Sequence, residues 1–131
     1  MPGYLEHQDA LKELGVENVI IFCVNDGAVM GIWNKEQVES YGKPNTLVTF
    51  FGDPAGELTR ACGMELTDPR PIEKGLIGRC KRFAMYVVNS VVQYVVVSES
   101  EDDPAGDEDP SATCAPDLIE AIQSLRTPAA A

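Results

Sequence analysis

Residues 4–26, YLEHQDALKELGVENVIIFCVND, decide the fold because they predict a helix that leads directly into a buried strand. Tyr4, Leu11 and Leu14 place apolar side chains along the helix, and the glycine that follows ends it. The run at 18–24 is nearly continuous in apolar and β-branched residues, which is typical of a strand covered on both faces. No strand signal precedes the helix, so we interpret it as a crossover helix whose leading strand is absent from this sequence.

The rest of the chain continues the alternation of helix and strand signals that is typical of an α/β domain. The predicted elements are a helix at 27–40, a strand at 46–51, a short helix at 56–63, a surface loop at 66–79 with one short helical turn or extended piece, two strands at 82–88 and 91–98, an acidic loop at 99–113 and a helix at 115–126. Asn89 and Ser90 predict a hairpin turn between the last two strands. We therefore expect one domain over 1–131, with a flexible tail at 127–131.

The charge of the chain excludes two classes of partner. Ten basic residues against 21 acidic ones give a formal net charge of −11, which opposes binding to nucleic acid or to anionic lipid. Residues 99–109 hold seven of the carboxylates, and without them 14 acidic residues face 10 basic ones. No run approaches the ~20 apolar residues of a membrane span, so we expect no direct membrane insertion. The acidic run lacks the ligand spacing of an EF-hand and is interpreted as a solvated loop or a contact for a basic partner.

The cysteines and the single histidine do not predict a metal site. Four cysteines stand far apart without a CxxC pair, and His7 cannot complete a zinc set at any common spacing. We expect no metal and no cofactor. Cys23 and Cys80 stand in apolar or strand-like stretches, where free cysteine usually behaves as a small buried apolar residue.

Five short motifs in sequence order carry a resemblance to a known family. They are PGY at 2–4, VNDGAVMGIW at 24–33, GDPAGELT at 52–59, KRFAMYVV at 81–88 and APDLIEAI at 115–122. Together they resemble the type II peroxiredoxins, plant type II and mammalian peroxiredoxin-5-like, which are thiol peroxidases of the thioredoxin superfamily. The resemblance implies an α/β, thioredoxin-like fold, here N-terminally truncated, with a mixed sheet flanked by helices. The absent strand would then lie between the strands at 18–24 and 82–88.

The resemblance also implies roles for two residues, each with an alternative. In the family, a peroxidatic cysteine stands in a PxxxTxxC motif ahead of the PGY motif, and this sequence contains no PxxxTxxC. Arg82 matches the family arginine that donates hydrogen bonds to peroxide and stabilises the thiolate, or else it pairs with a carboxylate beside the strand. Cys114 stands close to the mammalian-like resolving position, or else it is an incidental loop thiol. Gly27 and Ala28 replace the Pro-Phe common in the family.

Two hypotheses about function follow. The first is a non-catalytic accessory or structural subunit of a larger assembly, in which a protein partner closes the incomplete sheet. The alternative is a thiol-dependent peroxidase that reduces hydrogen peroxide and alkyl hydroperoxides, with its catalytic segment outside this sequence and with glutathione, glutaredoxin or thioredoxin as reductant. The resemblance to plant members suggests a plastid or cytoplasmic location and a photosynthetic assembly as one setting.

Overall fold

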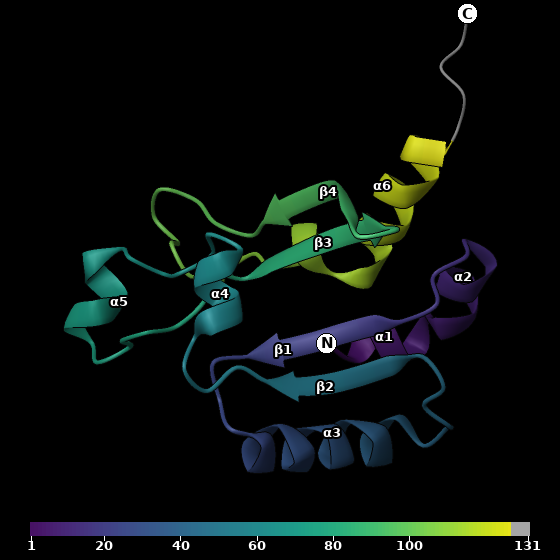
Figure 1. The fold of residues 1–131 in the computed structure, drawn as a ribbon, viewed down its shortest axis with the longest axis horizontal. Helices are drawn as coiled ribbons and strands as arrows, with labels where there is room; N and C mark the ends of the chain where they lie inside the picture. The colour runs from purple at the N-terminus through teal and green to yellow at the C-terminus, as the bar shows by residue number, and fades with distance from the viewer. Residues whose placement is uncertain (127–131) are drawn as a thin grey trace, which may run out of the picture.

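The computed structural model describes residues 1–126, and the tail predicted at 127–131 lies outside them. The elements are α1 (Pro2–Glu6), α2 (Gln8–Glu13), β1 (Val19–Cys23), α3 (Gly27–Tyr41), β2 (Val48–Gly52), α4 (Glu57–Ala61), α5 (Pro69–Glu73), β3 (Phe83–Val88), β4 (Val91–Val97), the 3-10 turn η1 (Ser111–Thr113) and α6 (Ala115–Arg126) (Figure 1). This alternation confirms the predicted α/β class. Every helix in residues 1–126 is too short or too polar to cross a lipid bilayer.

The strands form two sheets of two strands each. In the first sheet β1 and β2 are parallel, with Val19 opposite Val48, and in the second β3 and β4 are antiparallel, with Phe83 opposite Val97. Parallel and antiparallel strand pairing, the two kinds found in a mixed sheet, are therefore both present. Strands β1 and β3 neighbour one another through the rings of Phe22 and Phe83, and their arrows run in opposite directions in Figure 1. Within residues 1–126, no strand joins the two sheets.

The opening helix differs from its prediction in continuity and in the face that it buries. It is interrupted at His7, whose ring Nδ1 lies 2.7 Å from the carbonyl oxygen of Gly3. Its buried side chains are Leu5, Gln8 and Leu11 rather than the predicted stripe that includes Leu14. A glutamine is tolerated there because its side-chain amide is fully used by backbone groups, as described next.

The side chain of Gln8 connects the opening helix to the segment that leads into β2. Its Oε1 accepts from the backbone N–H groups of Thr46, at 2.8 Å, and Leu47, at 3.0 Å. Its Nε2 donates to the carbonyl oxygens of Leu5, at 3.1 Å, and Pro44, at 3.3 Å. Gln8 therefore fixes the helix over the main core cluster, which consists of Leu5, Leu11, Leu47 and Val48.

Strand β1 forms where it was predicted, but it is less covered than predicted. Ile20 is 59% exposed, and the other residues of the strand are only partly buried. Helix α3 contacts β2, and β1 has a paired strand on one side only within residues 1–126. The apolar run therefore correctly predicts a strand, but neighbouring elements cover its two faces only in part.

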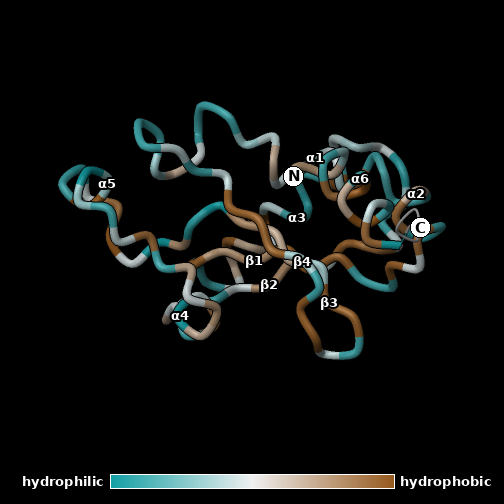
Figure 2. The backbone as a smooth tube through the Cα atoms, turned by 90° about the horizontal axis from the view of Figure 1, so that it is seen from above, coloured by the Kyte–Doolittle hydropathy of each residue, from teal (hydrophilic) through white to brown (hydrophobic). Residues whose placement is uncertain are grey.

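The hairpin and the last helix match their predictions closely. Asn89 and Ser90 have φ angles of 50° and 66°, the left-handed pair that a two-residue hairpin turn requires. Helix α6 spans the predicted 115–126 and buries Leu118 and Ile122 on its inner face. Figure 2 shows the tip of the β3–β4 hairpin projecting from the body as an apolar segment. Four valines at or near this tip are exposed: Val87, Val88, Val91 and Val92.

Candidate functional site

The start of α1, the residue before β3 and the residue before α6 converge in one place. Burial lowers the pKa of the Met1 amino group; the Cys114 thiol raises it, and the positive charge of Arg82 lowers it further. Burial also raises the pKa of the Tyr4 phenol, with a smaller contribution in the same direction from Cys114. The Tyr4 hydroxyl donates to the carbonyl oxygen of Thr113 at 2.6 Å. The fold thus brings both residues singled out in the sequence, Arg82 and Cys114, to the start of α1.

The guanidinium of Arg82 forms an ion pair with a residue that the sequence did not single out. Its Nη2 lies 2.9 Å from Oδ1 of Asp107, and the two side chains are 45% and 70% exposed. An ion pair at this exposure contributes only about 0–1 kcal/mol to stability. The pairing with a carboxylate, given above as one of two readings of Arg82, is present in the structure.

The acidic loop that carries Asp107 is folded around the carboxylate of Asp103. This carboxylate accepts backbone N–H groups from Asp107 at 3.0 Å, Glu108 at 2.9 Å and Asp109 at 3.4 Å. Burial opposes the charge on Asp103, but these backbone donors outweigh it and lower the pKa of the carboxyl. The loop is therefore ordered by its own acidic residue, which presents Asp107 toward Arg82. The sequence shows the cluster of carboxylates in this loop, but it does not predict which of them points toward Arg82.

Gly106 allows the loop to lie against the end of β4. Its φ is 70°, and a Cβ built on it would lie 1.9 Å from the carbonyl oxygen of Ser98. The hydroxyl of Ser98 is in turn 3.1 Å from the carbonyl oxygen of Pro110, to which it donates. Glycine is needed here both for its left-handed backbone and for its lack of a side chain.

Cys114 stands directly before α6 and is half-buried. Its Sγ–H donates weakly to the carbonyl oxygen of Pro110, 3.3 Å away. Cys23 and Cys80, expected to be buried, are instead only partly buried, as is Cys62. That expectation was wrong: Cys23 lies on β1, which has a paired strand on one side only within residues 1–126, and Cys80 lies ahead of β3 in an isolated bridge to Glu65.

The VND motif has a structural function in this chain. Asp26 caps α3, since its Oδ1 accepts from the backbone N–H of Val29 at 2.8 Å. The carbonyl oxygen of Asn25 lies so close to Gly52 that a Cβ there would be 2.6 Å away. Gly27 and Ala28, which replace the aromatic position of the family, are both exposed.

Other kinds of site are not evident in the described part of the chain. Residues 1–126 contain no group of three His, Cys, Asp or Glu side chains that could hold a metal ion. A shallow cavity of about 550 Å³ lies between the segment before α5 and the acidic loop. Lys81 and Arg70 line it, but Arg82 and Cys114 do not. The candidate site is therefore the place at the start of α1 where the guanidinium of Arg82 and the thiol of Cys114 meet.

The sequence model of the redoxin family matches residues 1–113 of the chain. The chain belongs to the peroxiredoxin family. Peroxiredoxin-2B of Arabidopsis thaliana is 41% identical over 85 residues, covering 65% of this chain and 48% of the relative. Peroxiredoxin-2C of Oryza sativa subsp. japonica is 35% identical over 99 residues, covering 76% and 56%. This peroxiredoxin chain thus spans about half the length of the curated relatives that it matches.

Solved peroxiredoxin structures support the thioredoxin-like fold. Reduced Prx3 of Vibrio vulnificus in complex with H2O2 superposes with a TM-score of 0.70 at 27% identity, covering 93% of this chain and 65% of that one. Peroxiredoxin 5 of Alvinella pompejana gives a TM-score of 0.65 at 27% identity, covering 94% and 67%. The family and fold expected from the five motifs are both confirmed.

Proposed function

We propose that this chain supplies the arginine side of a thiol peroxidase site that reduces hydrogen peroxide and alkyl hydroperoxides. Membership of the peroxiredoxin family supports the proposal, as does the solved relative from Vibrio vulnificus described in complex with H2O2. The 131 residues contain no PxxxTxxC motif, so the attacking thiolate would be contributed by a segment ahead of α1. Glutathione, glutaredoxin or thioredoxin would return the oxidised thiol to its reduced form.

The observation that carries this proposal is the positive charge of Arg82 acting at Met1, the residue directly before α1. It lowers the pKa of the Met1 amino group, and the same positive field would stabilise a thiolate placed beside it. A guanidinium has five N–H donors and remains charged at all physiological pH values. Asp107 accepts from one of its nitrogens, Nη2, so other donors of Arg82 can reach a peroxide oxygen.

The experiment joins the upstream segment of Arabidopsis peroxiredoxin-2B to Met1 and measures peroxide consumption with each thiol reductant. We expect turnover by the joined protein and only background consumption by the 131-residue chain. Arg82→Ala in the joined protein should lower kcat/KM by about 100-fold or more, as loss of one stabilising donor does elsewhere.

Arg70→Ala is the matched control. Arg70 is also exposed and lies 2.9 Å from a carboxylate, that of Asp68, so it has the same charge and the same kind of partner. It should leave peroxide turnover unchanged. A folded joined protein without turnover, or equal rates for Arg82→Ala and Arg70→Ala, would show that Arg82 does not serve a peroxidase site.

We also propose that Cys114 is the resolving thiol of this site. The Cys114 thiol raises the pKa of both the Met1 amino group and the Tyr4 phenol, so it lies within electrostatic range of the start of α1. One peroxide equivalent should produce an intramolecular disulfide of the attacking thiol in the joined protein. Cys114→Ser should abolish this disulfide, while Cys62→Ser should retain it. If Cys114→Ser retains that disulfide, the reading as an incidental loop thiol is correct.

A second candidate function is a non-catalytic subunit whose sheet is completed by a partner protein. Within residues 1–126, β1 is paired only with β2 and β3 only with β4. The unpaired edges of β1 and β3 face each other, and the two strands run in opposite directions. Unpaired strand edges are templates for an additional strand. A strand of suitable length between them would pair with both edges. A photosynthetic assembly is one hypothetical setting for such a partner.

Amide hydrogen exchange tests the second candidate. In the isolated chain, the amides of β1 and β3 that face each other should exchange quickly, and in the native assembly they should become protected. Equal protection in both samples would mean that no partner strand is needed. Peroxide turnover by the native assembly would favour the peroxidase proposal instead.

A further inference from the structure

Asp107 is held against Arg82 by a loop that is anchored beside that arginine. The backbone N–H of Ser98 donates to the carbonyl oxygen of Arg82 at 2.8 Å, and the hydroxyl of Ser98 donates to the carbonyl oxygen of Pro110 at 3.1 Å. The loop therefore leaves from Ser98 and returns to it on either side of Asp107. The Sγ–H of Cys114 donates to the same carbonyl oxygen of Pro110 at 3.3 Å, so this anchor also holds the thiol of the candidate site.

The carboxylate of Asp107 reaches the guanidinium through the course of the backbone. The backbone N–H of Asp107 donates to Oδ1 of Asp103 at 3.0 Å. The preceding residue, Gly106, packs against the carbonyl group of Ser98. An ion pair as exposed as that of Asp107 and Arg82 adds little to stability. The main effect of this carboxylate is therefore on what else can approach the guanidinium.

The ion pair leaves the arginine side of the site without a surplus of positive charge. An isolated guanidinium attracts anions of any kind. Here Oδ1 of Asp107 lies 2.9 Å from Nη2 of Arg82, so a second anion would meet a carboxylate as well as a guanidinium. Lys81, the neighbouring cation in the sequence, is itself paired, with its Nζ 3.4 Å from Oε2 of Glu99. A neutral hydroperoxide needs only N–H donors from Arg82 and meets no such repulsion.

We propose that Asp107 makes this site selective for neutral hydroperoxides, because its carboxylate repels hydroperoxides that carry a negative charge, such as those of free fatty acids. The selectivity rests on the peroxidase function proposed above. The repulsion at Arg82 itself requires only residues of this chain, so it can be measured without turnover.

The first experiment measures the repulsion on the 131-residue chain with two arginine reagents, phenylglyoxal and 4-carboxyphenylglyoxal, which differ by one carboxylate. The rate of modification at Arg82 is followed for each reagent at low ionic strength by peptide mass spectrometry. Asp107→Asn should lower the ratio of the neutral to the anionic rate by about fivefold, the effect of two unit charges about 4 Å apart in water. This variant keeps the backbone N–H that Asp103 accepts, so we expect the loop to retain its course.

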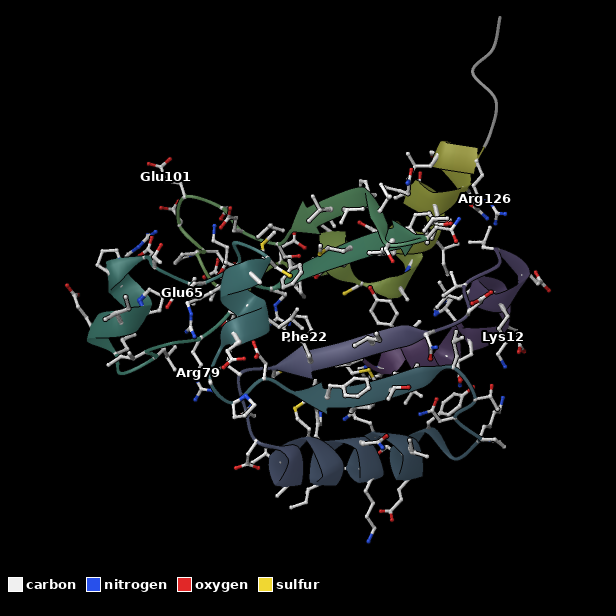
Figure 3. All side chains as sticks on the ribbon, viewed as in Figure 1. Lys12, Phe22, Glu65, Arg79, Glu101 and Arg126 are labelled. Atoms are coloured by element: carbon white, nitrogen blue, oxygen red, sulfur yellow. The ribbon has the colours of Figure 1, made fainter. Side chains whose placement is uncertain are left out.

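Glu101→Gln is the matched control, because it removes the same charge from another exposed position of the same loop. Figure 3 shows the side chain of Glu101 at the outer turn of this loop, directed away from the strands. The ratio of the two rates at Arg82 should remain unchanged in Glu101→Gln.

One comparison needs no variant. In the unaltered chain the ratio of the neutral to the anionic rate should be higher at Arg82 than at Arg60, which is also exposed and whose Nη2 donates to the neutral carbonyl oxygen of Ala55 at 2.9 Å. Concentrated salt should reduce this difference, since it screens charges at the surface.

The second experiment measures the selectivity in the joined protein, with linoleic acid hydroperoxide as the anionic substrate and its methyl ester as the neutral one. Asp107→Asn should raise kcat/KM for the acid relative to the ester by about fivefold, and Glu101→Gln should leave this ratio unchanged.

The contrary outcomes separate the two proposals. An unchanged reagent ratio at Arg82 in Asp107→Asn, or an equal change in Glu101→Gln, would overturn the role of Asp107. Turnover with the same acid-to-ester ratio in Asp107→Asn would overturn the selectivity alone. A joined protein without turnover would overturn the peroxidase function and the selectivity that rests on it, while a changed reagent ratio would still show that Asp107 repels anions from Arg82.

Discussion

Gly106→Ala is the most direct perturbation of the acidic loop that pairs with Arg82, and Gly78→Ala is its matched control. Both glycines have a φ of 70°. A Cβ at position 106 would lie 1.9 Å from the carbonyl oxygen of Ser98, whereas a Cβ at position 78 would meet nothing within 4 Å. The two variants therefore share the conformational cost and differ in the collision.

The expected magnitudes follow from that difference. Gly78→Ala carries only the cost of a left-handed alanine, about 1–2 kcal/mol. Gly106→Ala adds the collision, and forcing an extra methyl into a filled site costs about 1–3 kcal/mol more. Ser98 is 3% exposed, and its hydroxyl is held by Pro110 and Thr113, so it is not free to move away. We expect the loop to lift instead, which removes Asp107 from Arg82.

Two measurements check this reasoning. Urea denaturation should show a larger loss of unfolding free energy for Gly106→Ala than for Gly78→Ala. Modification by phenylglyoxal, followed by peptide mass spectrometry, should become faster at Arg82 in Gly106→Ala and remain unchanged at Arg70. Equal stability of the two variants, together with an unchanged rate at Arg82, would refute the view that Gly106 holds the loop in place.

Three further outcomes are expected. Leu5→Ala, at a residue 1% exposed, should cost about 2–5 kcal/mol in urea denaturation, whereas Leu125→Ala, at 51% exposure, should change stability by less than about 0.5 kcal/mol. Hydrogen bonds from the side chain and backbone of Arg70 lower the pKa of Asp68 from 3.8 to about 2. The stabilisation of the folded chain by this carboxylate is therefore complete at pH values above 3.8 and is lost as the pH falls through about 2. In Arg70→Ala, an NMR titration of the Asp68 carboxyl should show its pKa returning toward 3.8. Ser90→Gly should stabilise the hairpin by about 0.5–1 kcal/mol in the same denaturation assay, because Ser90 has a φ of 66° that glycine adopts without strain.

The elements with strong local signals were predictable from the sequence. Asn89 and Ser90 gave the hairpin turn, because asparagine tolerates a left-handed backbone and the flanking valines favour strands. The spacing of Leu118 and Ile122 predicted the buried face of α6. In both cases the decisive interactions lie within a few residues of one another, so the local sequence contains the information.

Features that depend on distant partners were not predictable. The opening helix buries Gln8, a choice that depends on backbone groups of Thr46 and Leu47 far along the chain. The partner of Arg82 is Asp107, one of seven carboxylates in a loop whose direction is set by Asp103 and Gly106. The family resemblance located Arg82 and Cys114, but no local pattern could indicate which carboxylate would meet the guanidinium.

The unpaired edges of β1 and β3 and the valine-rich hairpin tip have a consequence for the colloidal behaviour of the protein. Such surfaces attract further copies of the same chain, and at neutral pH the formal net charge of −11 keeps the copies apart. That repulsion disappears near the sequence pI of 4.3 and is screened by concentrated salt. Acid precipitation or high-salt chromatography would therefore convert a dispersed preparation into filaments or amorphous particles, and purification is best carried out above neutral pH at low ionic strength.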